Sequence, residues 1–509
     1  MEYVIGCDVG SQAVKAVLLS AEGEIVAEAG ASYDITYPRP AWAEQDSNLW
    51  IQGVIQAIAK LVKDCGVPVE KIRAIGLDAQ VEGCVPVDQA GEPLHAGIIW
   101  MDRRAVEQAE AIRKQHDASR LFDLSGLNLD PYHVAPKIRW LAETQPELYE
   151  KSRFFLQPGS YVAYRLSGEL GVDYSNASST LLMDVRKKEW STELCNCFQI
   201  SKEKLPPIYP ADTVIGSLLP DMAEQMGLDA QTKVILGCGD EHAASLGAGV
   251  ITPGLVCDIT GTAEPVGAAS PLPLFDETGL VETHCHAHPD LWFLENPGFV
   301  SGGNYRWLRE HFARDQEQEA TKLGVDIYDL LNREAENIPP GCDGLILLPC
   351  PSGAVTPTWN ALARGVFFGF TLAHQRGHFI RAVLEASAFA LRDITDRMQA
   401  MGLALSQIRA VGGGARSPLW RQIKADVTGL PVALLHTVET TALGAGLLAL
   451  AGMGYTRNLT ESVEIAVRLV ETRDPNPKTS EVYEAYYQLY RAAYFALLPV
   501  FAQASRINP

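Results

Sequence analysis

Two short turns in this sequence combine a glycine with a hydroxyl side chain directly after a run of apolar residues. Asp8, Gly10 and Ser11 form the first turn, and half a chain later Gly261 and Thr262 form the second. Glycine lets the backbone approach an anion, while N–H groups and hydroxyls of a tight turn donate to phosphate oxygens. A carboxylate beside a phosphate is repelled unless a divalent cation lies between them, so Asp8 indicates Mg²⁺. Hairpin turns also favour Asp and Gly, but two such turns predict a duplicated phosphate-binding architecture.

A third glycine-rich segment joins a predicted strand to a predicted helix, and it consists of Gly412, Gly413, Gly414 and Ala415. Its glycines clear side chains from the surface, so a flat ligand such as adenine or ribose can lie on bare backbone, although a flexible turn is the alternative. A second predicted helix with a glycine in its first turns starts at Glu439, and we expect this helix start to face the same ligand. Complete P-loop and Gly-x-Gly-x-x-Gly motifs are absent from the sequence, which argues against P-loop and dinucleotide enzymes.

Asp240 is the strongest candidate for a catalytic residue. It follows a predicted apolar strand, is flanked by Gly239 and Glu241, and begins a predicted helix. Aspartate is also a preferred helix cap, which is the structural alternative. A carboxylate placed in a closing cleft could accept the proton of an alcohol that attacks a phosphoryl group.

Polar residues at the carboxyl ends of two further predicted strands could bind the acceptor alcohol: Gln80, Glu82, Trp100, Asp102 and Arg103. Open α/β sheets bind ligands at this edge. The Trp100 ring could cover the C–H groups of a sugar, or it could pack in the core. Arg103 could equally be a solvated residue at a helix start.

Composition limits the classes of partner. The chain has 509 residues, 47% of them hydrophobic, and a net charge of −20, and its longest lysine/arginine run is only three residues. This argues against nucleic-acid and membrane partners, since both require basic patches. We expect a cytoplasmic protein, because the chain starts without a signal-like segment and its ten cysteines are scattered as in reduced proteins. The composition is also compatible with a homodimer.

The segment His284-Cys285-His286-Ala287-His288 looks like a metal cluster. On a strand, alternation would place its three histidines on one face. A second pair of ligands, as expected for a structural zinc site, does not follow in the sequence. We therefore interpret the segment as a polar strand face.

The two halves of the chain repeat the same order of elements. Each reads strand, glycine turn, strand, later a long amphipathic helix, and then a similar strand: Ile72–Gly76 in the first half and Ile408–Gly412 in the second. Ser47 is expected to cap the first of these helices. A Gly/Pro-rich stretch at 247–254 predicts a division into residues 1–250 and residues 251–509, with the two halves closing around a cleft.

These motifs together resemble the FGGY carbohydrate kinase family, and within it the xylulokinase-like branch. The resemblance extends along the whole chain and rests on the turn at Asp8, Trp100-Met101-Asp102, Gly239-Asp240, Asp258–Thr262, Gly412–Ala415 and Thr441–Ala445. A further signature reads Gly365–Phe370 followed by His378–Glu385, while the one near Lys137 is partial.

The resemblance implies an α/β protein with two actin-like, ribonuclease-H-like domains around a central cleft. ATP would lie mainly on the C-terminal domain and the sugar mainly on the N-terminal one, where Glu241 joins the residues expected to bind it. Asp240 would be the general base, with Asp8 and Asp240 next to Mg²⁺.

D-Xylulose is the first candidate substrate. Xylulokinases usually read Gln-Met-His-Gly where this chain reads Gln80-Val81-Glu82-Gly83. Kinases of ribulose, erythritol or glycerol type therefore stay open, as does a sugar-sensing pseudokinase. A phosphatase with Asp8 as nucleophile is disfavoured, because such enzymes generally have a second aspartate two residues further on, and position 10 of this chain is glycine.

Overall fold

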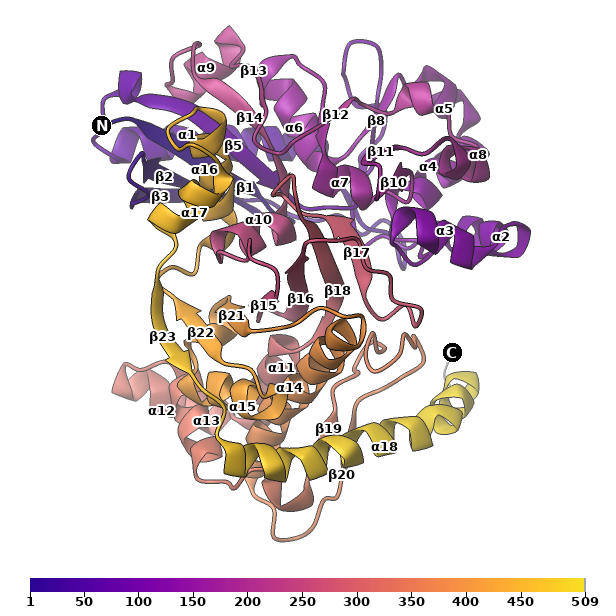
Figure 1. The fold of residues 1–509 in the computed structure, drawn as a ribbon, viewed down its shortest axis with the longest axis vertical. Coiled ribbons are helices and arrows are strands. Elements are labelled where there is room, and N and C mark those ends of the chain that lie inside the picture. The colour runs from indigo at the N-terminus through magenta and orange to yellow at the C-terminus, as the bar shows by residue number, and fades with distance from the viewer. Residues whose placement is uncertain (508–509) are drawn as a thin grey trace.

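The computed structural model describes residues 1–507, and it shows two lobes that are each built around one β-sheet (Figure 1). The N-terminal sheet has the strand order β13 (Val214–Ser217), β14 (Lys233–Gly239), β5 (Ile72–Ala79), β1 (Tyr3–Val9), β2 (Ala13–Ser20) and β3 (Ile25–Ser32). The C-terminal sheet has the order β17 (Glu282–Cys285), β18 (Trp292–Val300), β16 (Ala263–Ser270), β15 (Leu255–Ile259), β21 (Gln407–Val411), β22 (Val432–Leu435) and β23 (Leu469–Arg473).

The two sheets share one topology. In the N-terminal sheet β1 pairs antiparallel with β2 and parallel with β5, which in turn pairs parallel with β14. In the C-terminal sheet β15 pairs antiparallel with β16 and parallel with β21, which pairs parallel with β22. The similar strands recognised in the sequence, β5 and β21, therefore occupy equivalent positions. The predicted two-domain, actin-like fold is confirmed.

Within residues 1–507, helices account for most of the remaining regular structure of each lobe, together with five two-stranded sheets. Those of the N-terminal half are α1 (Ser47–Asp64), α2 (Val106–Gln115), α3 (Ala118–Ser125), α4 (Val134–Thr144), α5 (Pro146–Lys151), α6 (Pro158–Ser167), α7 (Tyr174–Ser178), α8 (Thr192–Phe198), α9 (Pro220–Met226) and α10 (Asp240–Gly247). Those of the C-terminal half are α11 (Gly302–Phe312), α12 (Arg314–Leu323), α13 (Ile327–Glu336), α14 (Arg376–Ala400), α15 (Pro418–Thr428), α16 (Thr440–Gly452), α17 (Leu459–Ala466) and α18 (Pro477–Ile507).

The strands of the N-terminal sheet are apolar along most of their length because helices cover both faces. On one face Ile5 and Cys7 join a buried cluster with Trp50 of α1. On the other face Val4 packs in a second cluster with Leu443 of α16. A sheet covered on both sides needs nearly continuous apolar strands, and β1 has them.

Helix α16 follows β22 in the chain, yet it lies against the N-terminal sheet, beside β1 and β5 (Figure 1). It also crosses α10, and at this crossing the two backbones touch: a Cβ on Gly247 would collide with the Thr440 carbonyl, and one on Gly444 with that of Ala243. Small residues allow this approach because no side chain separates the helices. The crossing sets the end of α10, at Gly247, against the start of α16, at Thr440.

Two local expectations were wrong. Helix α1 is capped by Asp46, whose side chain accepts a hydrogen bond from the Asn48 N–H group (3.0 Å), while Ser47 is already helical. Strand β17 ends at Cys285, so the three histidines do not share one strand face. His286 instead turns back, and its Nε2 atom lies 2.9 Å from the Val250 carbonyl oxygen.

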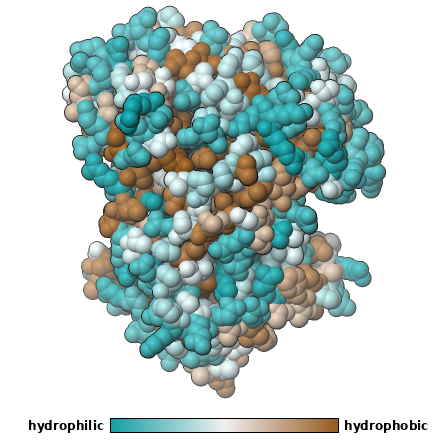
Figure 2. Space-filling model, in the orientation of Figure 1, coloured by the Kyte–Doolittle hydropathy of each residue, from teal (hydrophilic) through white to brown (hydrophobic). Residues whose placement is uncertain are grey.

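Hydrophilic residues cover much of the visible face of both lobes (Figure 2). Across residues 1–507, no helix combines the length and apolar character that a membrane crossing requires. All ten cysteines are free thiols, and eight of them are buried.

We predict that Gly444→Ala destabilises the protein by about 2 kcal/mol or more, because the new methyl group collides with backbone at the α10–α16 crossing. Alanine is a better helix former than glycine, so helix propensity alone would raise the stability. A lower free energy of unfolding would therefore be caused by the collision. Urea unfolding followed by circular dichroism measures the change. Gly365→Ala is the control, since its methyl group would meet only ordinary contacts; equal stability of both variants would contradict the prediction.

Candidate active site

Three carboxylates gather at the carboxyl ends of neighbouring strands of the N-terminal sheet. Asp8 and Asp78 are paired residues of the β1–β5 ladder, and Asp240 directly follows β14. Burial raises the pKa of Asp8 to about 6, and burial followed by the charge of Asp8 raises that of Asp78 well above its ordinary value. Within the described chain neither carboxylate oxygen of Asp78 has a hydrogen-bond partner. Buried carboxylates with free oxygens suit a hard divalent cation such as Mg²⁺.

Asp240 is the first residue of α10, and its Oδ1 atom accepts a hydrogen bond from the Glu241 N–H group (2.9 Å). The residue is partly exposed rather than sealed in the core. Its pKa is raised well above the ordinary value, first by burial and then by the charges of Glu241 and Asp8. A carboxylate with a raised pKa that remains accessible is suited to accept a proton.

The predicted phosphate turn and two predicted acceptor residues form one hydrogen-bonded group. The Trp100 indole N–H donates to Ser11 Oγ (2.8 Å), and Ser11 Oγ donates to Gln80 Oε1 (3.3 Å). The Gln80 amide donates to Gln45 Oε1 (2.9 Å), which fixes its orientation. Trp100 is 41% exposed, so it does not pack in the core. Its ring is available to a ligand.

Glu439 lies at the N-terminal phosphate turn. Gly10 closes this turn by donating its N–H to the Ala13 carbonyl (3.0 Å), and Lys15, two residues further, donates to Glu439 Oε2 (2.7 Å). The charge of Glu439 also contributes to the raised pKa of Asp8. The packing of α16 on β1 thus brings Glu439 from the C-terminal half close to Asp8 in the N-terminal half.

Glu82 has a left-handed backbone conformation (φ 63°), which is uncommon for a residue with a side chain. Its N–H donates to Gln157 Oε1 (3.1 Å), and its carbonyl accepts from the buried Lys137 ammonium (2.6 Å). Its Oε1 atom lies 3.1 Å from His133 Nδ1, whereas Oε2 has no partner in residues 1–507. The glutamate therefore presents one free carboxylate oxygen.

Glu241 is a neighbour of Glu82. Burial raises its pKa first, and the charge of Glu82 raises it further. Glu241 is also close enough to Glu295 of β18 to raise the pKa of that carboxyl group, after burial. The structure therefore brings Glu82 and Glu241 together from distant parts of the chain.

Asp102 and Arg103 differ from the other predicted acceptor residues. Asp102 is fully buried, forms a close ion pair with Arg104 (2.7 Å), and accepts a hydrogen bond from the Ala43 N–H (2.6 Å). Because both its oxygens are engaged, it supports the segment that carries Trp100. Arg103 is half-exposed and pairs with Asp130 (2.9 Å).

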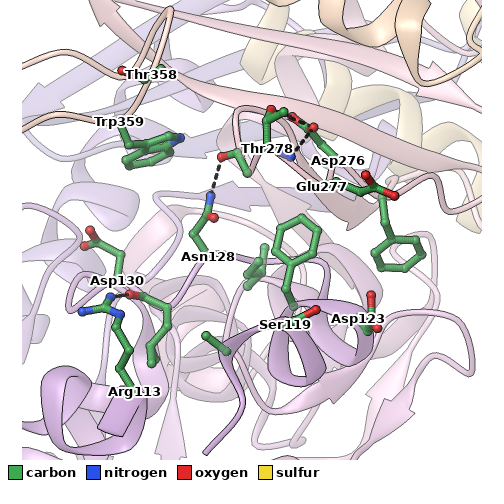
Figure 3. Close-up of a pocket in the computed structure, with 16 residues that line it drawn as sticks. Arg113, Ser119, Asp123, Asn128, Asp130, Asp276, Glu277, Thr278, Thr358 and Trp359 are labelled. Atoms are coloured by element: carbon green, nitrogen blue, oxygen red, sulfur yellow. Dashed lines mark hydrogen bonds between the residues drawn. The ribbon is translucent and has the colours of Figure 1, made fainter.

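Asp130 borders a cavity of about 580 Å³ that opens between the lobes (Figure 3). Residues near α3 form one wall, and Asp276, Thr278 and Trp359 from the C-terminal half form the other. The Asn128 amide donates across the gap to the Gly279 carbonyl (2.8 Å). Arg103 thus lies towards this opening.

The C-terminal turn is electrostatically different from its N-terminal counterpart. Asp258 is fully buried, and its carboxylate accepts from the Lys424 ammonium (2.6 Å), which also donates to Thr260 Oγ1 (2.6 Å) and pairs with Glu264 (3.0 Å). Burial lowers the pKa of Lys424, but the charges of Asp258 and Glu264 outweigh it and raise that pKa. Asp258 is thereby neutralised within the lobe.

A second cavity, of about 690 Å³, lies on the C-terminal lobe. The predicted loop reaches it, since the Gly414 N–H donates to the Thr260 carbonyl (3.1 Å) and so joins the loop to the turn. Its lining combines the two predicted glycine segments, two arginines, aromatic rings and polar side chains: Gly261, Thr262, Gly413, Gly414, Arg306, Arg416, Tyr305, Tyr328, Trp420 and Asn332. Gly412 and Ala415 flank this lining. Bare backbone, cations and rings together suit a nucleotide.

Several residues of the site were missed in the sequence. Asp78 had a visible signal, because it ends a strand as Asp8 does. Arg306, His133 and Glu295 had none, because each reaches the site only through the packing of segments that are far apart in the chain.

Comparison with known proteins agrees with this geometry. The models of the N-terminal and C-terminal domains of the FGGY family of carbohydrate kinases match residues 3–247 and 258–453. The chain belongs to this family. It is therefore a carbohydrate kinase, with ATP as the phosphoryl donor that this class implies.

Relatives of the kinase differ in substrate. It is 31% identical to a xylulose kinase of Bacillus subtilis over 97% of both chains, and 30% identical to a gluconokinase of the same organism over 89% of this chain and 88% of the relative. A ligand-bound xylulose kinase from Lactobacillus acidophilus superimposes with a TM-score of 0.91 at 26% identity, covering 99% of this chain and 100% of the other. These comparisons show the family and the fold.

We predict that His133 makes the stability of this kinase depend on pH. Burial lowers its pKa, but the charge of Glu82 and the contact with it, followed by the charge of Glu282, outweigh burial and raise the pKa from 6.5 to about 9. The protonated ring therefore stabilises the fold fully below pH 6.5, and this contribution is lost as the pH rises through 9. His133→Gln should cost about 3 kcal/mol at pH 6 and progressively less towards pH 10.

Urea unfolding of the two proteins between pH 6 and pH 10 tests this, with the exposed His311→Gln as control. A stability difference that stays constant or grows with pH would contradict the assignment.

Proposed function

We propose that the protein transfers the γ-phosphoryl group of ATP to a terminal hydroxyl of a small neutral ketose, with D-xylulose as the first candidate. The observation that carries the proposal is the position of Asp240. It begins the helix that crosses α16, remains accessible, and lies near enough to Asp8 and Glu241 for their charges to raise its pKa. Relatives that are named xylulose kinases support the first choice of sugar.

Asp240 would accept the proton of the acceptor hydroxyl, and that oxygen would attack the γ-phosphoryl group in line. Ser11, Gln80 and Trp100, which already form a hydrogen-bonded group, would position the acceptor beside the N-terminal turn. Glu82 and Glu241 would accept hydrogen bonds from its other hydroxyls. Closing of the lobes would exclude water, which otherwise competes as an acceptor.

ATP would lie in the cavity of about 690 Å³, with its base near the aromatic rings and its phosphates near Thr262. Arg306, which donates to Thr262 Oγ1 (3.3 Å), is placed to meet phosphate charge. Asp8, Asp78 and Asp240 would hold Mg²⁺, which neutralises developing charge on phosphate oxygens during such transfers. Asp102 and Arg103 would act indirectly, by holding the Trp100 segment and the rim of the opening.

The charges around the acceptor residues favour a neutral substrate. Glu82 and Glu241 are carboxyl groups, and the cations beside this segment are engaged. Lys137 donates to two backbone carbonyls, Arg103 pairs with Asp130, and the His133 ring pairs with Glu82 itself. A sugar acid such as gluconate would bring its carboxylate to carboxylates without gaining a free cation, which costs several kcal/mol. Hydroxyl groups can instead donate to the free Glu82 oxygen.

We predict that Asp240→Asn lowers kcat by about 10²- to 10⁴-fold while leaving the KM values for ATP and sugar within a few-fold, because it removes the proton acceptor but keeps the shape. Sugar-dependent ADP release measures this. Asp64→Asn, an exposed change at the end of α1, should behave as the wild type. Near-normal turnover of Asp240→Asn would remove the general-base assignment.

We also predict that kcat/KM for the preferred neutral ketose exceeds that for gluconate by about 100-fold or more, since the carboxylate substrate finds no free cation. A panel of pentuloses, hexuloses, erythritol, glycerol and gluconate, assayed for ADP release, decides this. A preference for another pentulose or a polyol would replace D-xylulose but keep the neutral class. Equal use of gluconate would overturn the class, and no ADP release with any member would indicate a sugar-sensing pseudokinase.

A further inference from the structure

A cluster of two imidazoles and one carboxylate lies where the two halves of the chain meet, beside the residues assigned to the active site. His242 belongs to α10, His284 to β17 and Glu295 to β18. One ligand atom from each of the three lies within 4.8 Å of the others, and His284 Nε2 is 3.4 Å from Glu295 Oε2. All three residues are at most 4% exposed.

The strands fix two of the three side chains. In the antiparallel β17–β18 ladder, Glu282 stands opposite Glu295, and His284 follows two residues after Glu282. His284 and Glu295 therefore project from the same face of the sheet as diagonal neighbours. His242 approaches this face from α10, with its ring centroid 5.7 Å from that of His284.

The hydrogen bonding of these imidazoles is incomplete. Within the described chain, neither ring nitrogen of His242 has a hydrogen-bond partner, nor does His284 Nδ1. Leaving a buried polar group unpaired costs about 1–3 kcal/mol. By contrast, His286 uses both ring nitrogens, with Nε2 at the Val250 carbonyl and Nδ1 accepting from the His288 N–H. His284 and His286 thus differ, because both ring nitrogens of His286 are hydrogen-bonded whereas Nδ1 of His284 is available to a further ligand.

From these observations we propose that His242, His284 and Glu295 bind one divalent transition-metal ion, of which Zn²⁺ is the best match. Two imidazoles and one carboxylate are a common zinc donor set, with a fourth position for water. Bonds of about 2.0–2.2 Å place tetrahedral ligands about 3.3–3.6 Å apart, so the His284–Glu295 spacing already fits. The ion differs from Mg²⁺, because nitrogen donors are uncommon for hard cations.

The position of the ion gives it a structural consequence. His242 is two residues beyond Asp240 on the same helix, whereas His284 and Glu295 belong to the C-terminal sheet. The ion would hold the start of α10 against β17 and β18. It would therefore fix the orientation of the helix that presents Asp240, without taking part in phosphoryl transfer.

Metal content and metal binding test the proposal independently of kinase activity. The full-length protein, purified without a histidine tag, should retain about one equivalent of zinc by inductively coupled plasma mass spectrometry. After chelation, addition of Co²⁺ should give the visible absorption of a four- or five-coordinate site. His284→Gln and Glu295→Gln should each weaken Zn²⁺ binding by about 100-fold or more, measured by competition with a chromophoric chelator.

His288→Gln is the matched control, because this half-exposed histidine lies outside the cluster and should leave binding unchanged. Circular dichroism of each variant shows whether it is folded. The proposal is overturned if the wild-type protein takes up neither Zn²⁺ nor Co²⁺ stoichiometrically, or if folded His284→Gln binds them as tightly as the wild type. Loss of kinase activity in Asp240→Asn with metal binding retained would separate this inference from the proposed function.

Discussion

The contact between α10 and α16 is the constraint on which the rest of the structure depends. The two helices cross with their backbones touching at Gly247 and Gly444, and α16 lies against the sheet strands at Gly6 in the same manner. Asp240 begins α10, and Glu439 directly precedes α16, which packs on both α10 and β1. This packing places residues from both halves near Asp8. Packing of backbone on backbone leaves little freedom for either helix to rotate or slide.

The two lobes share one topology, but the charges around their equivalent aspartates differ. Asp8 and Asp258 occupy equivalent positions at the ends of β1 and β15, but their surroundings differ in charge. Asp8 faces a second buried carboxylate in Asp78, whereas Asp258 is paired with Lys424. The N-terminal turn therefore retains negative charge that a cation can satisfy, and the C-terminal turn is internally neutralised. The difference in charge between the two turns comes from Lys424 on α15.

Much of the fold could be predicted from the sequence, because its signals are local. Strand periodicity, the glycine turns and the repeated Ile-Arg-Ala segment identified both sheets and their equivalence. The placement of Glu439 could not be predicted in the same way. Its partner Lys15 is 424 residues distant in the chain, and only the crossing of α16 onto the N-terminal sheet brings them together.

The same difference separates residues of the candidate site. Asp240, Ser11 and Gln80 could be recognised because each ends a strand or occupies a turn. The neutralisation of Asp102 by Arg104, and the arrival of His242 beside His284, depend on side-chain packing that leaves no periodic trace in the sequence. Asp102 illustrates the limit, since a polar residue at a strand end can serve the scaffold as well as a ligand.

Under the role proposed for Glu82 in sugar binding, its left-handed backbone limits how sugar preference can change within this scaffold. Glycine, asparagine, aspartate and histidine tolerate that conformation better than other residues, and β-branched side chains tolerate it poorly. Few residue types are therefore tolerated at position 82, and most of these are small or can form hydrogen bonds. The backbone conformation therefore restricts which residues can replace Glu82 as much as the chemistry of the acceptor does.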